Sequence, residues 1–335
     1  MPIDPGLPLI DLHHHLDGSV RLQTILELGR KYNLPIPAST LEELRPFVQV
    51  SSPQPDILAF FEKFKWQTIG LVNPEACRRV AYENVEDAAT EGLDYIELRF
   101  SPIFMSETHN LSPQAVVEAV VNGVRAGEKD FGIRANLIGI LSRTYGVDSA
   151  WRELDALLIC RDQIAGLDLA GDEIHFPGNL FVEHFKKARE SGWHITIHAG
   201  EATGPESIWQ AITELGAERI GHAVHAPEDP KLIDYLLIHQ IPIESNLTSN
   251  VQTSTVADYP SHPLRFFLEH GLCATINTDD PGISAIDLHY EYHAAESLAG
   301  LSNEMIHQAQ RNSLRAAFLT LTEKNEVLKK HQLKR

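Results

Sequence analysis

Four short segments of the 335-residue chain place histidine or acidic side chains directly after an apolar run that is typical of a β-strand. Three imidazoles and one carboxylate are the ligand types of a catalytic zinc site. A further acid and a fourth histidine would remain free to move protons. This combination predicts a metal-assisted hydrolase. The four segments carry His13-His14-His15, His198-Ala199-Gly200-Glu201, Gly221-His222 and Asp279-Asp280.

The prediction depends on the recurrence of this pattern, because each segment alone is weak evidence. With 17 His in the chain, about one His-x-His pair is expected by chance. His13 and His15 are two residues apart, and alternate residues of a strand share a face. Both can therefore face one metal ion while His14 points away. We expect His14 to be a packing or surface residue.

Eight apolar segments are predicted to be strands, and amphipathic stretches typical of helices lie between them. Glycine just before a strand is typical of a helix stop, and Gly92, Gly192, Gly216 and Gly271 have this position. The strands are expected at residues 9–12, 95–100, 136–141, 166–169, 195–197, 219–220, 241–244 and 274–277. Helices are expected at residues 75–92, 113–131, 179–192, 205–216 and 230–239.

This alternation predicts a parallel sheet closed into a (β/α)₈ barrel, with an open, doubly wound sheet as the alternative. Active sites of such barrels form at the C-terminal ends of the strands. The histidines and acids described above all follow predicted strands, so we expect them to gather at one mouth of the barrel.

A long insertion separates the first two predicted strands. Within it, Ile57, Phe60, Phe61 and Phe64 have the i, i+3, i+4, i+7 spacing of one apolar helical stripe, after a cap at Asp56. One hypothesis is a helix that packs on the barrel. The other is a lid, at about residues 40–72, that excludes water and contacts an aromatic substrate.

Composition indicates one globular domain spanning residues 1–335. The chain is 43% hydrophobic and 22% charged, without repeats or a linker. Its net charge of −18 argues against nucleic acid or an anionic membrane as a partner. No apolar run has the length of a membrane span, and no signal-peptide pattern begins the sequence. Three widely spaced cysteines, Cys77, Cys160 and Cys273, suggest a reducing, cytoplasmic compartment.

The residue types also suggest a reaction. Zinc lowers the pKa of a bound water from 15.7 to roughly 7, which produces a nucleophile at neutral pH. Glu201, kept protonated in a dry site, could donate a proton to a ring nitrogen and later to a leaving amine. His222 would orient or deprotonate the water, and Asp280 would hydrogen-bond substrate. The C-x-x-C motif of cytidine-type deaminases and the H-E-x-x-H motif of thermolysin-like peptidases are absent from the sequence.

The motifs resemble those of the adenosine deaminases in both order and spacing, and the bacterial form in particular, from residue 7 to about residue 324. The family consists of zinc-dependent (β/α)₈ barrels that hydrolyse adenosine and 2′-deoxyadenosine to inosine and 2′-deoxyinosine plus ammonia, a step of purine salvage. The matching motifs are HHHLDG (13–18), Ser101-Pro102 after Arg99-Phe100, LAGDE (169–173), HAGE (198–201), RIGH (219–222) and NTDDP (277–281).

The resemblance implies a role for each of these positions. His13, His15, His198 and Asp279 would hold one Zn²⁺ per chain. Glu201 would donate a proton to purine N1, and His222 would activate the water. The residues expected to contact substrate are His15, Asp17 at the ribose 5′-hydroxyl, the Gly171 N–H at purine N3 and Asp280 at purine N7.

A single zinc ion is favoured because no lysine follows the fourth predicted strand, where related binuclear barrels carry a modified lysine. The departures from the family pattern are small. Ala223-Val224-His225 stands where a second glycine is expected, and Asn246 has no interpretable role.

Three alternatives remain open. A deaminase of the free base adenine would be expected to have Glu in place of Asp17. An AMP deaminase is disfavoured because the Asp17 carboxylate would repel a phosphate. A barrel that binds a nucleoside or a partner protein without turnover is the third. The sequence carries no indication of oligomeric state.

Overall fold

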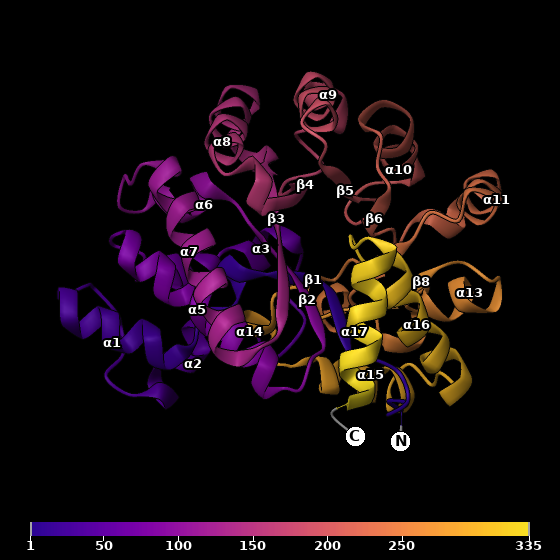
Figure 1. The fold of residues 1–335 in the computed structure, drawn as a ribbon, viewed down its shortest axis with the longest axis horizontal. Coiled ribbons are helices and arrows are strands. Elements are labelled where there is room, and N and C mark those ends of the chain that lie inside the picture. Colours follow the sequence, from indigo (N-terminus) through magenta and orange to yellow (C-terminus); the bar gives the residue numbers. More distant parts are fainter. Residues whose placement is uncertain (1, 334–335) are drawn as a thin grey trace.

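Eight strands alternate with helices along the chain in the computed structural model, which describes residues 2–333 (Figure 1). Each strand pairs in parallel with the next in chain order. The strands are β1 (Ile10–His15), β2 (Tyr95–Phe100), β3 (Arg134–Ser142), β4 (Ile164–Ala170), β5 (His194–Ala199), β6 (Arg219–His222), β7 (Ile243–Ser245) and β8 (Ala274–Ile276).

The segment after β8 returns to β1 and closes the sheet. The backbone N–H of His15 donates to the carbonyl of Asp279 at 2.7 Å, and the N–H of Asp279 donates to the carbonyl of His13 at 2.8 Å. The predicted (β/α)₈ barrel is therefore confirmed, and the alternative of an open, doubly wound sheet is wrong.

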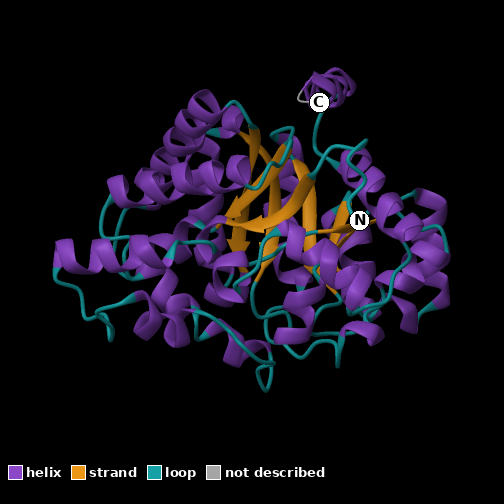
Figure 2. Cartoon of the chain, turned by 90° about the horizontal axis from the view of Figure 1, so that it is seen from below, coloured by secondary structure: helices purple, strands orange, loops and turns teal. Residues whose placement is uncertain are grey.

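Helices pack around the outside of the strands (Figure 2). They are α1 (Leu22–Tyr32), α2 (Leu41–Val48), α3 (Ile57–Phe61), α4 (Phe64–Thr68), α5 (Pro74–Thr90), α6 (Pro102–Glu107), α7 (Pro113–Phe131), α8 (Val147–Ile159), α9 (Val182–Glu190), α10 (Pro205–Gln210), α11 (Pro230–His239), α12 (Leu247–Gln252), α13 (Leu264–Glu269), α14 (Pro281–Ser284), α15 (Leu288–Ser297), α16 (Asn303–Ala316) and α17 (Leu321–Leu333). Within the described residues, none of these helices has both the length and the hydropathy of a membrane span.

Local sequence signals account for several helix boundaries. Ser112 caps α7 directly before Pro113, and Asp229 caps α11 directly before Pro230, so both predicted helices have the observed bounds. The glycines predicted to stop helices all have positive φ, between 76° and 82°. The predicted helix at residues 205–216 instead divides into α10 and one π-helical turn, η5 (Ala211–Leu215).

Several strands run further than predicted. β1 continues to His15, β5 to Ala199 and β6 to His222, so these histidines occupy the last residues of their strands and do not follow them. The prediction ended each strand where polar residues began. Polar side chains continue these strands because the barrel interior holds partners for them.

The two faces of β2 illustrate this arrangement. Ile96, Leu98 and Phe100 pack in the apolar core beneath the helices. Glu97 and Arg99 are fully buried on the other face and pair with charged residues of other strands inside the barrel. The barrel interior near the site is therefore polar, whereas the apolar core lies mainly between strands and helices.

The apolar stripe predicted to lie on one helix, residues 57–64, is divided between two short helices, α3 and α4. Asp56 accepts a hydrogen bond from the Ala59 N–H at 2.8 Å and caps α3, as predicted. The chain then turns at residues 62–63 before α4 begins at Phe64. The prediction of a single helical stripe is wrong. Phe60, Phe61 and Phe64 nevertheless pack together with edge-to-face ring contacts.

Candidate metal centre and active site

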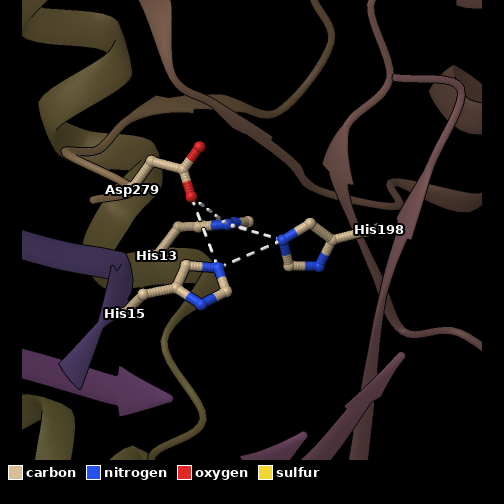
Figure 3. Close-up of side chains that lie close together, drawn as sticks. All are labelled: His13, His15, His198 and Asp279. Atoms are coloured by element: carbon tan, nitrogen blue, oxygen red, sulfur yellow. Dashed lines mark hydrogen bonds and ion pairs between the residues drawn. The ribbon is translucent and has the colours of Figure 1, made fainter. Parts of the chain in front are cut away.

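Four of the predicted residues come together at the C-terminal end of the barrel (Figure 3). Nε2 of His198 lies 3.1 Å from Nε2 of His13 and 3.2 Å from Nε2 of His15. Oδ1 of Asp279 lies 3.1 Å and 3.3 Å from the same atoms of His13 and His15. All four side chains are buried, and their ligand atoms lie within 4.8 Å of one another.

These separations suit a single metal ion. Zinc bonds of about 2.0–2.2 Å at tetrahedral angles place ligand atoms roughly 3.3–3.6 Å apart, close to the distances observed. Nitrogen and carboxylate oxygen are also the atom types that zinc prefers. The geometry and chemistry of the donor set therefore fit zinc.

Carboxylates behind two of the histidines fix their orientation. Nδ1 of His13 lies 2.6 Å from Glu244, and Nδ1 of His198 lies 2.9 Å from Asp168. An Nδ1–H donated to a carboxylate leaves the Nε2 lone pair free for a metal. Burial also lowers the pKa of His198 to about 4, which favours the neutral ring.

Two buried arginines keep these carboxylates charged. Arg99 pairs with Asp168 and with Glu244, each at 2.8 Å, and Arg219 pairs with Glu244 and with Glu97, each at 2.5 Å. Burial opposes ionisation of Glu244, but Arg99 and Arg219 hold the pKa of its carboxyl well below the ordinary value. The candidate metal ligands are thus supported by a network of buried ion pairs.

Sequence reasoning missed this supporting network. Its members lie inside otherwise apolar strands, where a charged residue must have a buried partner. The charged residues within apolar strands were visible in the sequence, but the partner of each one was not. The members are Glu97, Arg99, Asp168, Arg219 and Glu244.

Glu201 lies on the loop after β5, 7% exposed. The carboxylate of Glu173 holds this loop by accepting the backbone N–H groups of residues 200–203 at 2.7–3.2 Å. Burial, followed by the negative charges of Asp279 and Glu173, raises the pKa of Glu201 well above its ordinary value. Burial therefore favours the protonated carboxylic acid form of Glu201.

His222 ends β6 beside this acid, with Nδ1 3.6 Å from the Glu201 carboxylate. Its Nε2 faces the cluster, 3.9 Å from Asp279 Oδ2, outside the four-residue ligand group. Burial lowers the pKa of His222 well below its ordinary value, so the ring is neutral. His222 and Ala223 both have positive φ, 66° and 52°, a strained backbone of the kind found at functional sites.

Two amides hold the far side of the His222 ring. The Nδ2 atoms of Asn246 and Asn250 lie 3.2 Å and 3.0 Å from His222 Nδ1. Asn246, which had no interpretable role in the sequence, thus contacts a predicted catalytic residue. Asn250 was missed, although the two amides are four residues apart and therefore face the same way at the start of α12.

Asp280 lies against the loop after β1. Its Oδ1 is buried without a hydrogen-bond partner, which makes it available to a ligand. A Cβ atom on Gly18 would lie 1.9 Å from this oxygen, so only glycine fits there. Burial and the neighbouring Asp279 raise the pKa of Asp280 well above its ordinary value.

Two adjoining cavities extend from the cluster. The inner one, about 50 Å³, is bordered by Glu201, His222, Asp279 and Asp280, and the outer one is about 240 Å³. Both are lined by His15, Phe61, Phe64, Ala170 and Gly171. The outer cavity also contains Asp17, whose Oδ2 accepts the Ser101 N–H at 2.9 Å.

His14 points away from this centre. Its Nε2 lies 3.1 Å from the side-chain oxygen of Asn84, and its Nδ1 lies 3.1 Å from the Thr278 hydroxyl. Every other histidine or acid predicted to hold the metal, act in catalysis or contact substrate lines the cluster or its cavities.

A family model and two similar sequences all carry the name adenosine deaminase. The chain matches the family model described as "Adenosine deaminase" over residues 8–332. It is 60% identical over 328 residues to the adenosine deaminase of Klebsiella pneumoniae (strain 342), and the match covers 98% of both chains. It is 59% identical over 328 residues to the adenosine deaminase of Escherichia coli O1:K1 / APEC, with the same coverage.

Solved structures with similar folds carry more varied names. Adenine deaminase from Arthrobacter aurescens superposes with a TM-score of 0.90 and 26% identity, covering 97% of this chain and 98% of that chain. Arabidopsis ADAL complexed with GMP has a TM-score of 0.83 and 27% identity, covering 98% of each. The barrel fold is thus shared by proteins whose names point to different substrates or ligands, so the fold alone does not identify the substrate.

Proposed function

The chain belongs to the adenosine deaminase family, and we propose that it hydrolyses adenosine and 2′-deoxyadenosine to inosine and 2′-deoxyinosine plus ammonia. The observation that carries this proposal is the convergence of His13, His15, His198 and Asp279 beside a buried acid, Glu201. Relatives about 60% identical over nearly the whole chain support adenosine as the substrate. The reaction would belong to purine salvage.

We propose that one zinc ion binds His13, His15, His198 and Asp279. Bound zinc would make water a nucleophile at neutral pH. The carboxylates of Glu244 and Asp168 keep Nε2 of His13 and His198 directed at the ion. The protein would therefore bind the metal without rearranging its side chains.

The role proposed for Glu201 is to protonate purine N1. Protonation makes the adjacent carbon more electrophilic, and the same carboxyl group can later deliver a proton to the leaving ammonia. Its raised pKa supports this role, because an ionised carboxylate has no proton to donate. His222, which lies beside Glu201 in the inner cavity, would contact the attacking water.

Asp280 and Gly171 would hold the purine. The raised pKa of Asp280 favours its protonated form, whose unpartnered Oδ1 can donate a hydrogen bond to N7, and the Gly171 N–H can donate to N3. Phe61 and Phe64 line both cavities, which suits an apolar lid that keeps water from the purine. The boundaries of that lid, about residues 40–72, remain a prediction.

Asp17 supports a nucleoside as the substrate over a free base or a nucleotide. One carboxylate oxygen accepts the Ser101 N–H, and the other, which lies 3.7 Å from Nδ1 of His15, can also accept a hydrogen bond from a 5′-hydroxyl. A site built for such a bond discriminates against a ligand that lacks it. A phosphate in the same place would meet like charge.

The test is a side-by-side measurement of ammonia release from adenosine, adenine and AMP, together with the zinc content of the purified protein. We expect one zinc per chain and kcat/KM highest for adenosine. Faster turnover of adenine or AMP would replace the proposed substrate. Zinc without turnover of any of the three would favour a nucleoside-binding barrel.

The predicted cytoplasmic location also remains a proposal. It is supported by Cys77, Cys160 and Cys273, which are all free thiols. Fractionation of the source cells would test it.

A further inference from the structure

A chain of hydrogen bonds behind His222 begins at a group whose role is unambiguous. The backbone N–H of Leu264, which can only donate, lies 3.1 Å from Nδ1 of His262. Nδ1 must therefore be the acceptor. Burial lowers the pKa of His262 to about 3, so the ring is neutral and carries its single proton on Nε2.

His262 in turn fixes the amide of Asn250. Its Nε2–H lies 3.1 Å from Oδ1 of Asn250 and donates to it. The amide nitrogen of Asn250 must then face the opposite way, 3.0 Å from Nδ1 of His222 and 3.2 Å from the Thr255 hydroxyl oxygen. The Thr255 hydroxyl oxygen is 3.2 Å from the Asn250 carbonyl, to which it can donate, so it is free to accept from the amide nitrogen.

The orientation of Asn250 determines where His222 carries its proton. An amide N–H is a donor, so Nδ1 of His222 must present its lone pair. The amide of Asn246 also approaches this atom, at 3.2 Å, but its Oδ1 is buried without a partner, so the orientation of Asn250 alone carries the assignment. A neutral ring whose Nδ1 accepts carries its hydrogen on Nε2, the atom that faces the ligand cluster.

We propose that His262 and Asn250 are positioning residues that fix His222 as its Nε2–H tautomer. His222 then acts on the attacking water as a hydrogen-bond donor and orients it. It does not act as a base, because the nitrogen that faces the water already holds a proton. This proposal deepens the proposed function and rests on it for the identity of the attacking group.

The direct test is two-bond ¹H–¹⁵N correlation spectroscopy of the zinc-loaded enzyme labelled with ¹⁵N-histidine. The His222 signals are assigned by their loss in His222→Asn. We expect the Nε2–H pattern in the unmodified protein. An Nδ1–H pattern would overturn the proposal, and it would do so whether or not the enzyme deaminates adenosine.

Asn250→Asp is the variant that should reverse the tautomer. A carboxylate still accepts from His262, but it also accepts from Nδ1 of His222 and so draws the proton to that side. We expect an Nδ1–H or doubly protonated ring, unchanged zinc content and KM, and a kcat lower by roughly 10- to 100-fold, as is typical when groups supporting a metal site are changed. An unchanged His222 spectrum would overturn the proposal.

A pair of substitutions at His262 keeps the test valid if Asn250→Asp fails to fold. Glutamine offers an acceptor to Leu264 and a donor to Asn250, so His262→Gln should retain the Nε2–H pattern and native kcat. His262→Leu removes the hydrogen-bond donor to Asn250, so it should lose both the Nε2–H pattern of His222 and the native kcat. Thr255→Val is the matched control, because it contacts Asn250 without determining its orientation, and should leave the His222 spectrum native. Equal behaviour of the Gln and Leu variants would contradict the proposal.

Discussion

The two ends of the barrel differ, and cavity volume alone does not identify the end that holds the candidate site. The larger cavity, about 890 Å³, lies at the N-terminal end, between α17 and the starts of β3, β4 and β5. In Figure 2, α17 stands apart from the ring of helices, beside the C-terminus. The cavities at the C-terminal end are only about 240 and 50 Å³. Cavity size would place the site at the wrong end.

The burial, pairing and pKa shifts of the charged groups distinguish the two ends. At the N-terminal end, Arg134 pairs with Glu323 and Arg125 with Glu128, and these side chains remain partly exposed. At the C-terminal end, acids are buried, their pKa values are shifted, and Asp280 has an oxygen without a partner. Buried polar groups that the fold does not satisfy therefore identify the site better than empty volume does.

Removal of the metal should have the largest effect. Bound zinc lowers the pKa of water from 15.7 to roughly 7, so turnover of chelator-treated protein should fall to the background rate. Unfolding temperature should also fall, because the buried ligands lose their common partner. Steady-state assays and calorimetry before and after dialysis test this, and added zinc should restore both. Full activity in protein shown to be metal-free would contradict the proposed site.

Glu201→Gln should have the second largest effect on turnover. Glutamine retains the shape of the acid without a transferable proton, so kcat should fall by roughly 10²–10⁴-fold while zinc content and KM stay near native. Glu206→Gln, at an exposed acid five residues further along, is the matched control and should be neutral. If the Glu201 variant keeps more than about a tenth of the native kcat, another group donates the proton.

Asp17 should show a smaller, substrate-dependent effect. Loss of a hydrogen bond to a charged group costs about 1.5–3 kcal/mol, so Asp17→Asn should lower kcat/KM for adenosine by roughly 10- to 100-fold. It should change 5′-deoxyadenosine turnover little. Asn is preferred to Ala because it still accepts the Ser101 N–H. Equal losses for the two substrates would mean that Asp17 only holds the loop.

Arg134→Ala tests the N-terminal end and should have the smallest effect. The Arg134–Glu323 pair is partly exposed, so its loss should lower the free energy of unfolding by only about 0–1 kcal/mol. Because the pair lies at the opposite end from the metal cluster, kcat/KM for adenosine should be unchanged. Denaturant unfolding and steady-state kinetics measure the two quantities. A tenfold loss of kcat/KM would show that the two ends are coupled and would contradict the functional difference drawn between them.

Strand contacts explain which strand ends were predictable. β2 was predicted with its observed bounds, because residues 95–100 begin and end beside clear breaks in hydropathy. β3 and β5 run past their predicted ends because each forms a ladder with neighbouring strands, and a ladder continues wherever partner strands are present. The break between α3 and α4 at residues 62–63 was not predictable from the helical period, which continues through Phe64.

The sequence by itself determined the alternation of strands and helices, and hence the barrel, because hydrophobic periodicity and helix caps are local properties of the chain. It also determined that His13, His15, His198 and Asp279 gather at one mouth, because parallel strands all end there. Only the tertiary structure decided which groups support them. The pairing of Arg99 with Asp168 and Glu244, and the relay from His262 through Asn250 to His222, join residues on different elements. Such contacts depend on side-chain directions in the closed fold, which no local pattern encodes.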